Sequence, residues 1–176
     1  TRWLFPEAPL SLNMGFGDSR AWWIIDFARI QADREAGRIR DLSIEVPQGL
    51  ALARERFLAF LKELPKQLPI DYKKTVIGGF SQGAMLTCDA VLQTDYPFAG
   101  LVQLSGNLLA QAVWGPLMRK RKGLPVFQSP GTQDDVLHRR LDDSAGSQPE
   151  GTGRSRCPES VFQLLRELEG PRQFRR

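Results

Sequence analysis

The sequence has few of the residues that build metal sites and disulfide frameworks. Among its 176 residues it contains two cysteines, Cys88 and Cys157, and one histidine, His138. Two cysteines are too few for a disulfide scaffold. With one histidine and no Cys-x-x-Cys pair, a zinc site is not expected. We therefore predict no metal.

Long apolar runs are also missing. No stretch approaches the ~20 apolar residues that a membrane-spanning helix needs, and no signal peptide is recognisable in the sequence. We therefore expect no membrane span and a cytoplasmic location.

The sequence lacks a strong excess of either charge, since it contains 24 Lys and Arg residues and 20 Asp and Glu residues. Much of the positive charge lies late, at Arg119-Lys120-Arg121-Lys122 and in the tail 172–176. Such runs suit a phosphate or a membrane surface, or they are simply a solvated loop and terminus. We favour the second interpretation and expect no nucleic-acid partner, because no nucleic-acid motif accompanies the runs.

The chain does contain alternating strand and helix patterns. Its length suits one domain. Apolar residues at spacings of three and four predict a helix over 47–64, started by Pro47 and stopped by Pro65. Further helices are predicted at 82–94 and, in one or two short pieces, within 21–36. Residues 10–20 are predicted as loop, and strands are predicted at 3–5, 75–77, 99–104 and 124–128. This alternation predicts an α/β fold with a mostly parallel sheet and helices on both faces.

The composition changes near the end of the chain. From His138 to Ser160 only Leu141, Ala145 and Cys157 are apolar, so this stretch buries too little surface to offset its ordering entropy. Pro158 then opens an amphipathic helix that Gly170 stops. We predict an α/β domain over 1–137, an irregular or disordered segment over 138–157, and a helix with a basic tail over 158–176.

The stretch Gly79-Phe80-Ser81-Gln82-Gly83 follows a β-branched strand and precedes a helical segment. A G-x-S-x-G sequence in this context indicates a nucleophile elbow, a strained strand-to-helix turn that presents the serine. Glycines fit two residues to either side, where side chains would collide. The N–H of Gln82 would then stabilise an oxyanion at the helix N-terminus. The alternative is a glycine-rich turn with an N-capping serine.

A second stretch, 131–137, follows the last predicted strand with the sequence Gly-Thr-Gln-Asp-Asp-Val-Leu. In α/β-hydrolases the acid of the catalytic triad follows the serine in the sequence and lies on such a loop. The acid would orient and stabilise a histidine imidazolium. An Asp- and Gly-rich turn is the alternative.

Four stretches in matching order and spacing carry a family resemblance, namely 5–9, 20–26, 78–85 and 131–137. With them the chain resembles the phospholipase/carboxylesterase family of small α/β-hydrolases, which includes bacterial carboxylesterases and acyl-protein thioesterases. The resemblance implies hydrolysis of a small-molecule ester or acyl substrate without a cofactor. It does not indicate an oligomeric state. It implies Ser81 as nucleophile and Asp134 as triad acid, with Asp135 as an adjacent alternative. It also implies an acyl pocket near Trp22, Trp23 and Leu108.

The chain departs from the family pattern at three places. The family begins well before the stretch 5–9, so we expect an incomplete fold here. Pro130 stands where the family has a histidine that is not catalytic. The triad histidine itself is missing, and Arg154 or its neighbours Gly153 and Ser155 occupy its place. Arginine stays protonated and cannot act as the base.

His138 is the remaining candidate base. It lies four residues after Asp134 on the same loop, where it is poorly placed to bridge acid and serine. One hypothesis explains the break: residues from about 138 to 157 are translated out of frame. The sequence thus predicts a serine hydrolase that is impaired in this chain. The alternatives are a non-catalytic acyl-binding or interaction protein and a non-functional gene fragment.

Overall fold

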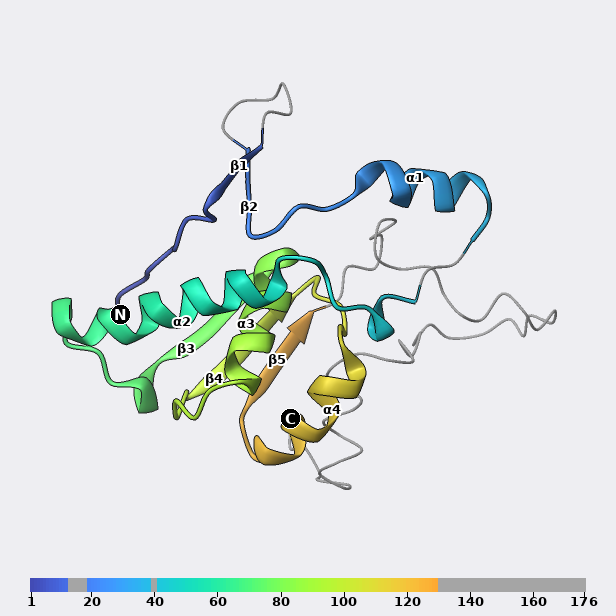
Figure 1. Cartoon of the computed structure of the whole chain (residues 1–176). Coiled ribbons are helices and arrows are strands. Elements are labelled where there is room, and N and C mark those ends of the chain that lie inside the picture. Colours follow the sequence, from blue (N-terminus) through green and yellow to red (C-terminus); the bar gives the residue numbers. More distant parts are fainter. Residues whose placement is uncertain (13–18, 39–40, 130–176) are drawn as a thin grey trace, which may run out of the picture.

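The computed structural model describes residues 1–12, 19–38 and 41–129 (Figure 1). Two sheets are present in these ranges, one of two strands and one of three strands. The predicted segments 138–157 and 158–176 lie outside the described residues, as does the end of the predicted domain 1–137.

The N-terminal part differs from its prediction. Residues 1–9 contain no strand, and Trp3 and Phe5 are 75% and 86% exposed. The predicted strand at 3–5 is therefore wrong, because this apolar triplet has no strand partner among the described residues. The predicted loop 10–20 instead contributes to an antiparallel pair, β1 (Leu10–Leu12) with β2 (Ser19–Ala21). One helix, α1 (Phe27–Glu35), forms within the predicted range 21–36.

Helix α2 (Leu50–Gln67) buries the predicted apolar stripe. It begins after Gly49, and Pro65 lies inside it rather than ending it. Proline has no N–H, so the carbonyl of Leu61 loses its usual helical donor. The hydroxyl of Tyr72, in the short 3₁₀ helix η2 (Tyr72–Lys74), donates to this carbonyl instead. The proline is tolerated because a side chain replaces the missing hydrogen bond.

The central sheet is parallel, as predicted. Strand β3 (Val76–Phe80) pairs with β4 (Gly100–Leu104), and β4 pairs with β5 (Val126–Ser129). Because all three strands run the same way, their carboxyl ends share one edge. That edge is where β3 passes into helix α3 (Gln82–Leu92).

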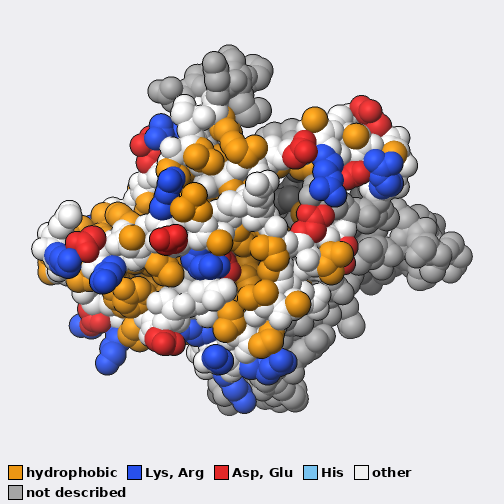
Figure 2. All heavy atoms as spheres, viewed as in Figure 1, with side chains coloured by type: hydrophobic (Ala, Val, Ile, Leu, Met, Phe, Trp, Pro, Cys, Tyr) orange, Lys and Arg blue, Asp and Glu red, His pale blue; other side chains and the backbone are white. Residues whose placement is uncertain are grey.

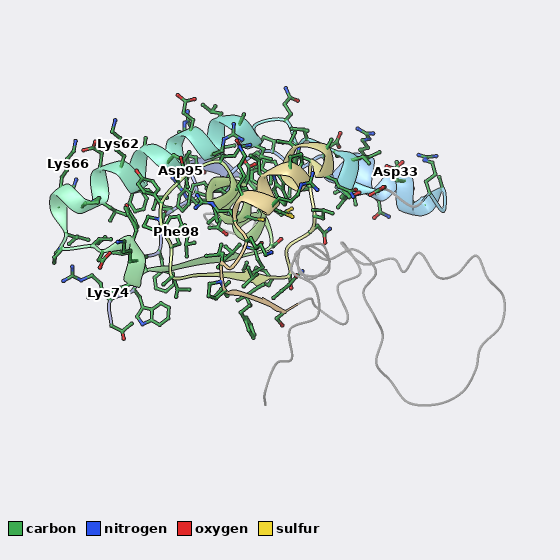
Figure 3. The ribbon with its side chains drawn as sticks, turned by 90° about the horizontal axis from the view of Figure 1, so that it is seen from below. Asp33, Lys62, Lys66, Lys74, Asp95 and Phe98 are labelled. Carbon is green, nitrogen blue, oxygen red and sulfur yellow. The ribbon has the colours of Figure 1, made fainter. Side chains whose placement is uncertain are left out.

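The described helices α2 and α3 lie on one side of the sheet, with Lys62 and Lys66 projecting from α2 away from it (Figure 3). Every residue from Ala84 to Leu92 in α3 is buried. On the strands, Phe80 and Phe127 are 68% and 61% exposed. The described residues therefore form an α/β fold in which α2 and α3 lie over one face of a parallel sheet.

Helix α4 (Gln111–Lys120) was not predicted. Gly115 and Pro116 weaken its helical pattern, but Trp114 and Met118 are buried on its inner side. Burial against the rest of the core thus overrides the local propensity.

The late basic run is not a free loop. Arg119 and Lys120 end α4, and Arg121 follows as its C-cap. The Arg121 guanidinium donates from Nε to the Val91 carbonyl at 3.0 Å and from Nη1 to the Tyr96 carbonyl at 3.3 Å. Val91 lies in the last turn of α3, and a cation near a helix C-terminus is favourable. Arg121 therefore has a structural role.

One buried carboxylate joins the three main helices. Asp89 in α3 is 1% exposed. Its Oδ2 pairs with Arg54 Nη1 of α2 at 2.8 Å, and its Oδ1 accepts from Trp114 Nε1 of α4 at 2.8 Å. Both carboxylate oxygens are satisfied, as a buried charge requires.

Candidate active site

Ser81 occupies the junction between β3 and α3. Its backbone angles are φ 50° and ψ −116°, outside the regions that L-residues normally adopt. Its N–H donates to the Leu104 carbonyl of β4 at 2.8 Å, and its carbonyl accepts from Ala84 and Met85 in the first turn of α3. Its side chain makes no capping hydrogen bond. The alternative of a side-chain N-cap therefore does not describe this serine.

The two glycines of the turn are not equivalent. A Cβ on Gly79 would come within 2.3 Å of the Gly83 carbonyl carbon and 2.7 Å of the Ala84 nitrogen. A Cβ on Gly83 would meet only Trp22 Nε1, at 3.9 Å. The collision expected for both positions therefore exists at Gly79 alone.

Gln82 is the first residue of α3. The first N–H groups of a helix lack intrahelical acceptors, and they carry the positive end of the helix dipole. The Gln82 side chain points elsewhere. Its Oε1 accepts from the Trp22 N–H and its Nε2 donates to the Trp23 carbonyl, both at 2.8 Å.

The tryptophan pair lines a groove of about 670 Å³, a volume typical of small-molecule sites. Trp23 is 4% exposed. The Trp22 ring packs edge-on against Phe57 of α2, with ring centroids 5.9 Å apart. Figure 2 shows hydrophobic side chains gathered where the base of the hairpin meets α2. The groove is mainly apolar and is lined by Leu10, Trp22, Trp23, Ile24, Ile25, Asp26, Gln48, Gly49, Leu52, Ala53 and Arg56.

The third predicted pocket residue lies elsewhere. Leu108 is 5% exposed and belongs to the hydrophobic core. The residues that line the groove do not include it.

The other predicted catalytic residues, Asp134 and His138, lie outside the described residues, as do Asp135 and Arg154. Among the described residues, the Gln82 side chain joins the turn that carries Ser81 to the backbone of Trp22 and Trp23, and the residues that line the groove include neither Ser81 nor Gln82.

Cys88 is not a candidate nucleophile. It is 1% exposed within α3, and burial, with a smaller contribution from neighbouring Asp89, raises the pKa of its thiol well above the usual range. Such a thiol stays protonated and unreactive.

Two further features bear on the class of site. Within residues 1–12, 19–38 and 41–129, no group of three or more His, Cys, Asp or Glu side chains could hold a metal ion. In that part of the chain, no helix has the length and apolar character needed to cross a membrane.

Sequence reasoning missed two details of this edge of the sheet. It did not predict the side-chain contacts of Gln82, whose partners lie 59 and 60 residues away in the chain. It also did not predict that Ser105, directly after β4, has a positive φ of 48°. The Ser-Gly pair at 105–106 was the available signal, since such pairs mark turns.

Comparison with known proteins places this turn in a family context. Residues 1–148 match the family model described as Phospholipase/Carboxylesterase. The chain is 30% identical over 141 residues to Acyl-protein thioesterase 1 of Schizosaccharomyces pombe, a match that covers 77% of this chain and 57% of that protein. It is 28% identical over 140 residues to the Debaryomyces hansenii protein of that name, covering 77% of this chain and 56% of the relative.

The chain therefore spans little more than half the length of these curated relatives. The family match nevertheless covers most of the chain and includes the strand, turn and helix around Ser81. The chain belongs to the phospholipase/carboxylesterase family.

Proposed function

We propose that this chain carries the nucleophile of a serine hydrolase that acts on carboxylic esters or thioesters. The observation that carries the proposal is the backbone of Ser81, which adopts φ 50° and ψ −116° between a parallel strand and a buried helix. Strain of this kind costs about 1–3 kcal/mol and is found mainly at functional sites.

In the proposed reaction, Ser81 Oγ attacks the acyl carbonyl and loses its proton to a base. The Gln82 N–H, at the N-terminus of α3, stabilises the oxyanion that forms. The alcohol or thiol then leaves with a proton, and water hydrolyses the acyl-serine. Asp134 is the proposed triad acid, with Asp135 as the alternative. The groove beside Trp22 and Trp23 is the proposed acyl site.

The sequence supplies no well-placed base, since its one histidine, His138, lies four residues from Asp134. We therefore expect p-nitrophenyl butyrate turnover to be weak or absent in this chain. In known triads, removing one member leaves ~10³–10⁴-fold catalysis over water, mainly from the oxyanion hole and binding.

A fluorophosphonate probe tests the nucleophile without requiring turnover. We expect slow labelling of the chain that maps to Ser81 and is lost in Ser81→Ala. Ser105→Ala is the matched control, because Ser105 also follows a parallel strand with a positive φ. Labelling that persists in Ser81→Ala, or is lost equally in Ser105→Ala, would contradict the proposal.

The groove supports a second candidate function, a non-catalytic acyl-binding protein. Its mainly apolar lining and volume of about 670 Å³ suit an alkyl chain. Saturable fatty-acid binding without any labelling at Ser81 would favour this function. A cytoplasmic location remains a prediction under either function.

A further inference from the structure

The side chain of Gln82 holds two adjacent peptide groups of a distant loop. Oε1 accepts from the Trp22 N–H at 2.8 Å, and Nε2 donates to the Trp23 carbonyl at 2.8 Å. One half of the amide acts as acceptor and the other as donor, so the amide has one favoured orientation. A carboxylate or an alkyl side chain could not make both bonds.

The Gln82 side chain and its two hydrogen bonds, to Trp22 and to Trp23, form a clamp. The two ends of this clamp belong to different parts of the site. At one end, Gln82 begins α3, and its N–H is the proposed oxyanion donor. At the other end, Trp22 and Trp23 line the groove. The clamp therefore connects the wall of the acyl site to the residue that follows the nucleophile.

The groove wall is also fixed from behind. A Cβ added at Gly49, directly before α2, would lie 2.9 Å from the Trp23 Cβ, so backbone and side chain meet closely there. The Trp22 ring rests against Phe57 of α2. A ligand that packs against Trp22 and Trp23 would further restrict the two peptide groups to which the Gln82 amide is hydrogen-bonded.

We propose that Gln82 is a positioning residue whose side chain couples occupancy of the groove by an alkyl chain to the order of the α3 N-terminus. The inference rests on the proposed function for the role of the Gln82 N–H. The acyl part of the substrate thereby helps to place the donor that stabilises the oxyanion. Two hydrogen bonds, each of ordinary net strength, limit the coupling to roughly thirtyfold.

The test measures exchange of the hydrogen-bonded amides of residues 84–86, with and without decanoate as the probe for the groove. Decanoate supplies an alkyl chain, and Arg56 at the groove supplies a cation for its carboxylate. In the wild-type chain we expect decanoate to slow exchange at the start of α3 by about tenfold. Tryptophan fluorescence reports decanoate binding independently.

Two substitutions at Gln82 distinguish an effect of the clamp on the decanoate response from a general loss of stability. In Gln82→Ala, decanoate should still bind but should slow exchange less than twofold. In Gln82→Glu, the carboxylate can accept from Trp22 but cannot donate to Trp23, so the response should also be lost. Gln93→Ala, at the exposed opposite end of α3, should keep the wild-type response. A purely structural role would raise exchange without decanoate and leave the ratio unchanged.

The inference is overturned if the α3 response persists in Gln82→Ala, or if the wild-type chain shows no response or no decanoate binding. Fluorophosphonate labelling of the same samples distinguishes it from the proposed function. A response that depends on Gln82 without labelling at Ser81 would refute the nucleophile and support the clamp. Labelling without the response would support the nucleophile and refute the clamp.

Discussion

Substitution of the two glycines around Ser81 by alanine should change stability in opposite directions. In Gly79→Ala the new Cβ would lie 2.3 Å from a backbone carbon of Gly83. Ordinary contacts of this kind begin at 3.4 Å, so the start of α3 must move by 1.1 Å, the difference between the two distances. The clash involves backbone atoms, which cannot rotate away.

Overpacking in a well-packed interior costs about 1–3 kcal/mol, and we expect the upper end, about 3 kcal/mol, for Gly79→Ala. Gly83→Ala meets open space apart from Trp22 at 3.9 Å. Within a helix this change should stabilise by about 0.5–1 kcal/mol, because alanine is the better helix former. The two variants should therefore differ by nearly 4 kcal/mol in free energy of unfolding.

Urea denaturation followed by tryptophan fluorescence measures both values, with the slope of the transition checked for a common two-state mechanism. If Gly79→Ala unfolds within 0.5 kcal/mol of the wild-type chain, the close approach of β3 and α3 is not as described. If Gly83→Ala loses as much as Gly79→Ala, the assignment of the constraint to one glycine is wrong. Fluorophosphonate labelling should fall in Gly79→Ala and persist in Gly83→Ala.

Tyr72→Phe should destabilise by about 1–3 kcal/mol, because it leaves the Leu61 carbonyl without its donor. Tyr96→Phe, in a neighbouring ring tilted against that of Tyr72, is the control. Equal losses of stability in both variants would contradict the role of the Tyr72 hydroxyl. Burial, with Tyr96 adding to it, raises the pKa of Tyr72 above its ordinary 10.0, so its contribution to stability should be present below pH 10 and be lost as the pH rises further. The Cys88 thiol has a raised pKa through burial, so in a Cys157→Ser background iodoacetamide at pH 8 should modify the chain only after unfolding. Rapid modification of the folded chain would contradict that burial.

The sequence predicted the centre of the fold because the signals there are local. The predicted helix 82–94 and strand 99–104 correspond to α3 and β4 within two residues at each end. Both are dense in apolar residues and bounded by Gly, Ser or polar residues. The strained turn at Ser81 was predictable for the same reason, since its strand, glycines and helix are contiguous.

The errors arose where distant contacts decide the structure. Helix α4 contains Gly115 and Pro116 and forms because Trp114 and Met118 are buried. Strands β1 and β2 have three residues each, too few for an alternating pattern to stand out. Helix α2 continues through Pro65 because Tyr72, seven residues later, replaces the missing donor.

The strained turn at Ser81 is held by contacts that lie entirely within the described residues. The Leu104 carbonyl accepts the Ser81 N–H, and the first turn of α3 donates two N–H groups to the Ser81 carbonyl. Three backbone hydrogen bonds, at about 1 kcal/mol each, are enough to offset a strained residue that costs about 1–3 kcal/mol. None of these contacts uses the Ser81 hydroxyl, so Ser81→Ala should keep the turn and remove only the proposed nucleophile. The geometry of the turn therefore does not depend on the group that would accept the proton in the proposed reaction, so weak turnover alone would not show that the turn is absent.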